Sequence, residues 1–333
     1  TTASSNVAIG KNALGANTTG TRNTAVGHNS LDANTNSTDN TAVGYNALTT
    51  ANGADECTAV GQGALALTTT GDNNTGIGFA ALNANTTATE NTALGSNSLN
   101  SNTTASFNTA VGSRSLESNT TGTSNTAIGR YSLPNNTTAD NNTAVGRNCM
   151  AANTTGHSNV AIGSSALQTN QTGNNNTAIG YLSLDKTTQD QNVAVGNYTL
   201  RENLTGEYNT ATGYAALTKN TTANNNTAFG YKALKLNTTG EANTAVGANA
   251  LDANTTGSSL VAVGLGSLGN STTGNKNTAV GRSALNANTT ASHCTAVGNE
   301  ALAANTTGLY NVAIGSEALK TSTSSNNMVA IGF

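Results

Sequence analysis

The stretch NTAVGANALDANTTGSS, residues 243–259, decides the fold because close copies of it fill the chain. Asn243 follows Asn226 by 17 residues, and this spacing recurs through 20 copies of the motif. One step, from Asn176 to Asn192, is 16 residues long. A fixed period of this size is typical of solenoids and other repeat proteins. We number the columns of each copy from 1, at the first Asn, to 17.

The columns differ in how much they vary. Column 5 is glycine in all 20 copies, column 3 is alanine except at Gly76, and column 9 is leucine in every complete copy except at Met150. Column 2 is always Thr or Val, column 4 is mostly Val or Ile, and columns 12 to 15 mostly read Asn-Thr-Thr-Gly or Asn-Thr-Thr-Ala. Columns 6, 7, 10, 11, 16 and 17 vary freely, which indicates solvated surface.

The constant columns predict one coil per repeat. Columns 2 to 4 suit a short strand with columns 2 and 4 on one face, and glycine at column 5 suits a bend. We expect a second short strand at columns 8 and 9, with its Leu packed against an inward-facing column of Val and Ile. The Asn-Thr-Thr-Gly segment has turn chemistry, and the absence of a 3.6-residue period disfavours helix. A single unit cannot bury its own Val, Ile and Leu side chains, whereas stacked units can.

We therefore predict an all-β protein: a parallel β-solenoid, or β-roll, of about twenty 17-residue coils that forms a single repeat domain over residues 1–333. Asn at column 1, present in 16 of the 20 copies, is expected to form an amide ladder along the stack. Neither end carries a polar cap, which solenoids normally need. This predicts a part of a longer fibre, or a domain that stacks end to end.

Column 3 lies on the opposite side of the strand from columns 2 and 4, yet it never exceeds alanine in size. A second surface packed closely there would explain this limit, so Ala161, Ala245 and Ala313 are candidate contacts between chains, as in a homotrimer around an axis. A tight bend within one coil is the alternative.

Composition and spacing argue against an enzyme. Charged residues make up 9% of the chain, against about 25% in typical globular proteins, and the net charge of −3 gives no footprint for nucleic acid. The histidines, His28, His157 and His293, fall in distant turns, so they do not form a metal site or a triad. No phosphate-binding or calcium-binding motif is present, so we expect no cofactor and no metal. No apolar run of about 20 residues exists, so we expect no membrane insertion.

The three cysteines are Cys57, Cys149 and Cys294. Their separation along the stack forbids a disulfide within one chain, because a bridge needs Cα atoms within about 7 Å of each other. We interpret them as small buried side chains. A bridge between chains near a symmetry axis is the alternative.

Two binding functions remain as alternatives to a purely structural one. Five tyrosines in consecutive turns could form an exposed strip that stacks on the sugars of cell-surface glycans; they are Tyr181, Tyr198, Tyr208, Tyr214 and Tyr231. Threonines at columns 2, 13 and 14 could form ladders that bind ice, although the expected inward direction of column 2 counts against this.

The motif Asn-Thr/Val-Ala-Val/Ile-Gly followed by small residues resembles the left-handed parallel β-roll heads of YadA-like trimeric autotransporter adhesins, most closely at residues 159–163 and 311–315. The full repeat is also similar to repeat regions of phage tail-fibre proteins. Adhesin heads use shorter units, so the Asn-Thr-Thr-Gly segment is an additional loop. The resemblance covers nearly the whole chain. It implies a trimeric, fibrous element located outside the cell, on the cell surface or on a virion, that often supports adhesion.

The sequence thus favours a non-enzymatic structural fibre element: a rod, shaft or head of an adhesin or tail fibre that associates with copies of itself and displays surface loops. Its expected partners are further copies of the same chain, as a homotrimer or an end-to-end polymer, and cell-surface glycans.

Overall fold

The computed structural model describes residues 2–333, which form 20 β-strands and no helix. The chain divides into two compact units, Thr1–Thr172 and Gly173–Phe333. Each unit is a parallel β-solenoid with one strand per repeat, which confirms the predicted fold class. Whether residues 1–333 act as one domain stays a prediction.

The first unit contains ten strands of three residues, each paired in parallel with the next along the chain. The register is 17 residues, as in the pairing of Val7 with Thr24. The strands are β1 (Val7–Ile9), β2 (Thr24–Val26), β3 (Thr41–Val43), β4 (Thr58–Val60), β5 (Thr75–Ile77), β6 (Thr92–Leu94), β7 (Thr109–Val111), β8 (Thr126–Ile128), β9 (Thr143–Val145) and β10 (Val160–Ile162).

The second unit repeats this arrangement with ten further strands. Its first pair has a 16-residue register, Thr177 to Val193, because the intervening loop is one residue shorter. The strands are β11 (Thr177–Ile179), β12 (Val193–Val195), β13 (Thr210–Thr212), β14 (Thr227–Phe229), β15 (Thr244–Val246), β16 (Val261–Val263), β17 (Thr278–Val280), β18 (Thr295–Val297), β19 (Val312–Ile314) and β20 (Val329–Ile331).

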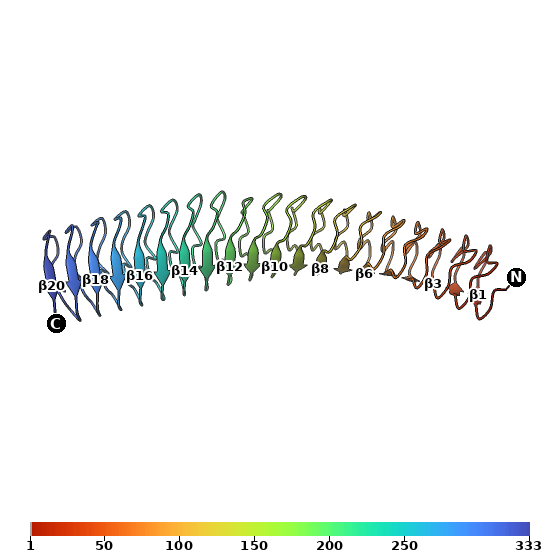
Figure 1. The fold of residues 1–333 in the computed structure, drawn as a ribbon, viewed down its shortest axis with the longest axis horizontal. Coiled ribbons are helices and arrows are strands. Elements are labelled where there is room, and N and C mark those ends of the chain that lie inside the picture. The colour runs from red at the N-terminus through yellow and green to blue at the C-terminus, as the bar shows by residue number, and fades with distance from the viewer. Residues whose placement is uncertain (1) are drawn as a thin grey trace. The chain divides into compact units, whose positions relative to one another are not determined.

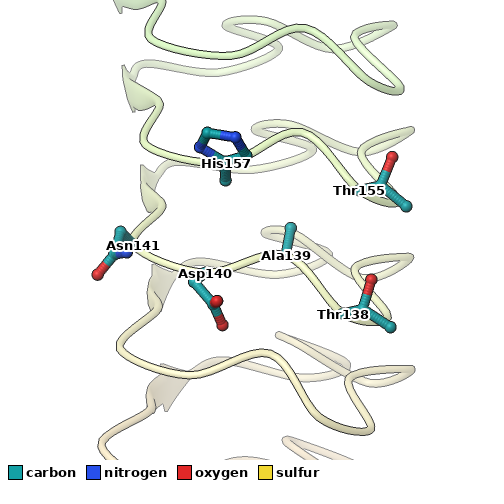
Figure 2. A pocket seen from close by; sticks show the side chains of 6 residues that line it. All are labelled: Thr138, Ala139, Asp140, Asn141, Thr155 and His157. Carbon is teal, nitrogen blue, oxygen red and sulfur yellow. The ribbon is translucent and has the colours of Figure 1, made fainter.

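Each coil has its strand on one side (Figure 1), and Thr138 and Thr155, from two of the Asn-Thr-Thr segments, lie at the opposite ends of their coils (Figure 2). Glycine is required at column 5: Gly247 has φ +133°, and a Cβ there would lie 2.6 Å from the carbonyl oxygen of Gly264 in the next coil. The second strand expected at columns 8 and 9 is wrong, because the strands of residues 2–333 all lie at columns 2 to 4. Leu251, at column 9, has φ +52° and turns the chain instead.

The interior of the coil is narrow and lies against column 3. Ala245 and Leu251 are fully buried, whereas Val246 is 37% exposed. Leu at column 9 therefore faces inward as predicted, but its partner is Ala of column 3, and the expectation that columns 2 and 4 form the core is wrong. The side chains of column 3 stay small because the interior of the coil has little room beside them. At Gly76 an added Cβ would lie 3.1 Å from the oxygen of Ala81 and 3.2 Å from the Cγ of Leu65.

Two ladders of buried asparagines connect successive coils. At column 1, the Asn226 Oδ1 accepts from the backbone N–H of Asn243, and the Asn243 Nδ2 donates to the oxygen of Gly257. The predicted ladder is thus present, mainly as bonds between side chain and backbone. A second ladder, at column 12, was not predicted: Asn237 Nδ2 donates to Asn220 Oδ1 at 3.1 Å and to the oxygen of Gly240 at 2.9 Å.

Candidate functional site

The most extensive candidate surface is the outer side of the strands, formed by columns 2 and 4, which we call the sheet face. Its column 4 side chains stand outward in register in consecutive turns of the second unit, with Val246, Val263 and Val280 each 36–37% exposed. Ile128 and Ile162 show the same exposure, 40%, in the first unit. The sheet face therefore presents an ordered apolar strip within each unit.

The candidate chain-to-chain contacts at column 3 do not lie on this face. The side chains of Ala161, Ala245 and Ala313 are fully buried within their own chain. Their expected role in packing against another chain is therefore wrong. The steric limit comes from the interior of one coil, which agrees with the single-coil alternative more than with a neighbouring chain.

The sheet face also carries a row of threonines at column 2. In the first unit, eight consecutive strands from β2 to β9 begin with Thr, and the parallel register places each beside the next, as Thr58 lies beside Thr75. These side chains point outward, since each strand shows a partly exposed or exposed residue on either side of a buried one. The inward direction expected for column 2 is wrong, which removes the objection raised against an ice-binding face.

The structure brings together four of the five predicted tyrosines. The ring centroids of Tyr181 and Tyr198 are 5.5 Å apart, those of Tyr198 and Tyr214 are 5.9 Å apart, and those of Tyr214 and Tyr231 are 5.6 Å apart. Tyr208, at column 17, is 55% exposed, and no ring contact among residues 2–333 includes it. The tyrosine strip thus exists, without Tyr208.

A surface groove of about 460 Å³ runs beside the tyrosine strip, and we call it the tyrosine groove. Its residues come from columns 6, 7 and 10 of three successive coils. It is lined by Tyr198, Arg201, Tyr214, Ala215, Thr218, Lys232 and Lys235.

Cations line the tyrosine groove together with the rings. Arg201 Cζ lies 5.7 Å from the ring centroid of Tyr198, and Lys232 Nζ lies 4.8 Å from that of Tyr231. Sequence reasoning singled out the tyrosines and missed the cations. The available signal was the coincidence of basic residues at columns 7 and 10 with tyrosines at columns 6 and 7 of the same coils.

Comparison of the chain with protein-family models and with characterised proteins gives no match. The function is therefore inferred from the geometry of these surfaces.

A second, smaller hollow of about 280 Å³ lies in the first unit and is open to solvent. Figure 2 shows His157 and Asp140 on successive coils, with Thr138 and Thr155 toward the loop ends of the same coils. Asp140 Oδ1 already accepts from the backbone N–H of Thr123 at 2.6 Å and from its hydroxyl at 3.0 Å. This carboxylate thus connects two coils and is not poised for acid–base chemistry.

Two other acids of column 16, Asp55 and Asp72, have the same structural role, since Asp72 Oδ1 accepts from the backbone N–H of Asp55 at 2.8 Å. Asp55, in the single adjacent acid pair of the sequence, accepts from the N–H of Thr38 at 2.6 Å. No group of three or more His, Cys, Asp or Glu side chains within residues 2–333 has the arrangement of a metal site. In the same residues no helix has the length and apolar character needed to cross a bilayer.

The three thiols are buried inside the coils. Burial raises the pKa of Cys57 to about 11 and that of Cys149 to about 12, and it also raises the pKa of Cys294. A thiol in this environment is unreactive at neutral pH, because the thiolate is the nucleophile. The interpretation as small buried side chains fits this burial, and the alternative of a bridge between chains does not.

Proposed function

We propose that this chain is a non-enzymatic structural element of an extracellular fibre or filament, and that copies of it associate through the sheet face. The observation that carries this proposal is the strip of outward Val and Ile side chains at column 4, in register from coil to coil. Monomeric soluble proteins seldom expose extended apolar strips, and such strips mark interaction sites.

A further copy of the same chain is a suitable partner for this strip. A second chain carries the same strip of column 4 side chains, at the spacing of neighbouring strands, about 4.8 Å. Two such strips interdigitate along the length of a unit, and rotation about an axis closes the contact into a homotrimer or another cyclic assembly. The low content of charged side chains supports a packed, fibrous role, as a rod, shaft or head on a cell surface or virion.

A second candidate function, ice binding, is favoured by one observation on the same face. The eight threonines from β2 to β9 form an outward, evenly spaced row beside the Val and Ile side chains of column 4. A regular array of hydroxyl and methyl groups can match the spacing of an ordered water lattice. Thermal hysteresis measured on the wild-type protein decides this candidate, and its absence eliminates it.

The test of self-association replaces three residues of the strip, Val246, Val263 and Val280, by lysine in one variant. We expect wild-type protein to sediment as an oligomer at micromolar concentration. The triple variant should associate at least about 100-fold more weakly, because burying unpaired ammonium groups in an apolar contact costs several kcal/mol.

The matched control carries the same number of lysines on the loop side of the same coils, at the exposed Thr256, Thr273 and Thr290. This control should sediment as the wild type does, and circular dichroism should show the same fold for all three proteins. A wild-type protein that stays monomeric at high concentration would contradict the proposal. So would a sheet-face variant that associates as tightly as the control.

A further inference from the structure

The tyrosine groove shares no residue with the sheet face and is built on columns 6, 7 and 10 of the coils that contain β12, β13 and β14. Tyr214 and Tyr231 are each 47% exposed, so part of each ring is free to contact a ligand. The ring of Tyr198, at column 7, contacts the rings of both Tyr181 and Tyr214. The volume of the groove, about 460 Å³, is within the range of small-ligand sites.

Positive charge is concentrated at this place. Five of the 13 lysines and arginines fall within residues 186–235, against three of the 16 acids, in a chain of net charge −3. One of those acids, Glu202, is already paired with Lys219 at 2.8 Å. Three cations remain along the groove wall: Arg201, Lys232 and Lys235.

One polar atom of the groove has no partner. The Nε of Arg201 is buried, and no hydrogen-bond acceptor among residues 2–333 reaches it. A buried donor that lacks an acceptor costs about 1–3 kcal/mol, so the Arg201 side chain is not held in this position by a hydrogen bond at its Nε. Asp185 interacts electrostatically with Arg201, and Asp252 with Lys235 and Lys232; burial raises the pKa of both carboxyl groups. Both therefore pass into the neutral form at higher pH than ordinary carboxyl groups do.

We propose that the tyrosine groove binds an anionic saccharide, in which a pyranose ring packs on the tyrosine rings and a carboxylate or sulfate group contacts Arg201, Lys232 and Lys235. Tyrosine rings offer flat apolar surface to the C–H face of a sugar and hydroxyl groups to its rim. Guanidinium and ammonium groups bind carboxylate and sulfate oxygens through charge-assisted hydrogen bonds. The proposal is independent of self-association, since the groove and the sheet face share no residue.

A single-stranded nucleic acid uses similar chemistry, but it needs a basic track over many nucleotides. Here the excess of cations is confined to a few coils, and the chain as a whole is acidic. A ligand of one or two charged sugar units fits this short extent better.

The experiment measures binding by calorimetry to four probes of similar length: a sulfated hexasaccharide, a uronic-acid hexasaccharide, a neutral hexasaccharide and hexathymidylate. We expect binding to one or both charged saccharides, weakened by added salt because the contacts are ionic. The double variant Lys232→Ala/Lys235→Ala and the variant Arg201→Ala should each weaken it by about tenfold or more, the loss of one or two charged contacts.

The ring contribution is tested separately. Tyr214→Ala should weaken binding about tenfold, whereas Tyr214→Phe, which keeps the ring, should stay within about threefold of the wild type. Matched controls are Lys276→Ala and Tyr310→Ala, an exposed cation and an exposed tyrosine outside the groove, and neither should change the affinity. Thermal unfolding verifies that each variant is folded.

Several outcomes would overturn the proposal. They are a neutral saccharide that binds as tightly as the charged ones, control variants that lose as much affinity as the groove variants, and no binding of any saccharide at millimolar concentration. Tighter binding of hexathymidylate than of any saccharide would reassign the groove to nucleic acid. A wild-type protein that stays monomeric but binds a charged saccharide would contradict only the proposed function. A wild-type oligomer that binds no saccharide would contradict only this inference.

Discussion

On the loop side of a coil, Asn237 forms hydrogen bonds with Asn220 and Gly240 and accepts one from Asn254 at 2.7 Å. On the sheet side, Val246 stands outward with more than a third of its side chain exposed. The loop side thus satisfies most of its polar groups within the chain, although Asn254 Oδ1, Ser271 Oγ and Asn288 Oδ1 are buried without a hydrogen-bond partner in residues 2–333. The sheet side leaves ordered apolar atoms exposed to solvent. The difference indicates that the sheet side is where another surface is required.

This contrast also explains which columns of the repeat are constant. Asn at columns 1 and 12 is kept by hydrogen bonds inside the chain, and Ala at column 3 is kept by the narrow interior. Val or Ile at column 4 has no such internal cause, because its side chain faces outward. Column 4 is Val or Ile in 17 of the 20 copies, the exceptions being Leu94, Thr212 and Phe229. This near-constancy agrees with an external surface that requires a similar apolar shape at most coils.

The largest effect should come from a comparison of leucine substitutions at two adjacent residues, one buried and one exposed. Ala245→Leu forces extra carbons into the filled interior and should destabilise the second unit by about 1–3 kcal/mol or more. Val246→Leu, one residue further along the chain, should change stability by less than about 0.5 kcal/mol, because its side chain is outside. Urea unfolding of both variants measures the difference. The opposite ranking would place columns 2 and 4 inside the coil.

A somewhat smaller effect is expected on the loop side. Asn237→Ala removes both donor bonds and the acceptor of Asn254, so buried polar groups of the neighbouring coils lose their partners. We expect a loss of about 1–3 kcal/mol in the free energy of unfolding. Thr239→Ala, on an exposed side chain of the same loop, is the matched control and should lie within about 0.5 kcal/mol of the wild type. Equal effects would show that the column 12 ladder does not stabilise the coil.

The smallest effect concerns the one charged group of the repeat at residues 243–259, Asp252. Burial raises the pKa of this carboxyl, and Lys235 and Lys232 offset the shift only in part. The protonated form is therefore favoured by folding, and its contribution is present below the ordinary pKa of aspartate and lost as pH rises through the folded-state pKa. Asp252→Asn should raise stability at pH 7 by less than about 0.5 kcal/mol, since the group is partly solvated, and leave it unchanged at pH 2.5.

Thermal unfolding at the two pH values measures this difference, and Glu241→Gln, an exposed acid in the preceding coil, controls for the change in net charge. A variant that is less stable than the wild type at pH 7 would mean that attraction to the lysines outweighs burial.

The tyrosines show which contacts the repeat columns predict and which they do not. The period places Tyr214 and Tyr231 in the same column of adjacent coils, so their proximity was predictable. Tyr198 belongs to the coil between those of Tyr181 and Tyr214, but it stands in column 7 and not in column 6, so its contact with both rings did not follow from the period alone. The cations of the groove were equally visible in the sequence, but their approach to the rings depends on how columns 7 and 10 bend toward column 6.

The sequence by itself determined the parallel solenoid, the 17-residue coil, the bend at column 5 and the burial of Leu at column 9, because a period and a constant glycine leave few other ways to stack. Only the tertiary structure decided which side of the strand faces inward. A three-residue strand with alternating faces is compatible with either direction, and apolar Val and Ile favour the core when hydrophobicity alone is considered. The coil is too narrow for them. Its interior accepts Ala at column 3, and the larger side chains of column 4 are left outside, where they form the candidate contact surface.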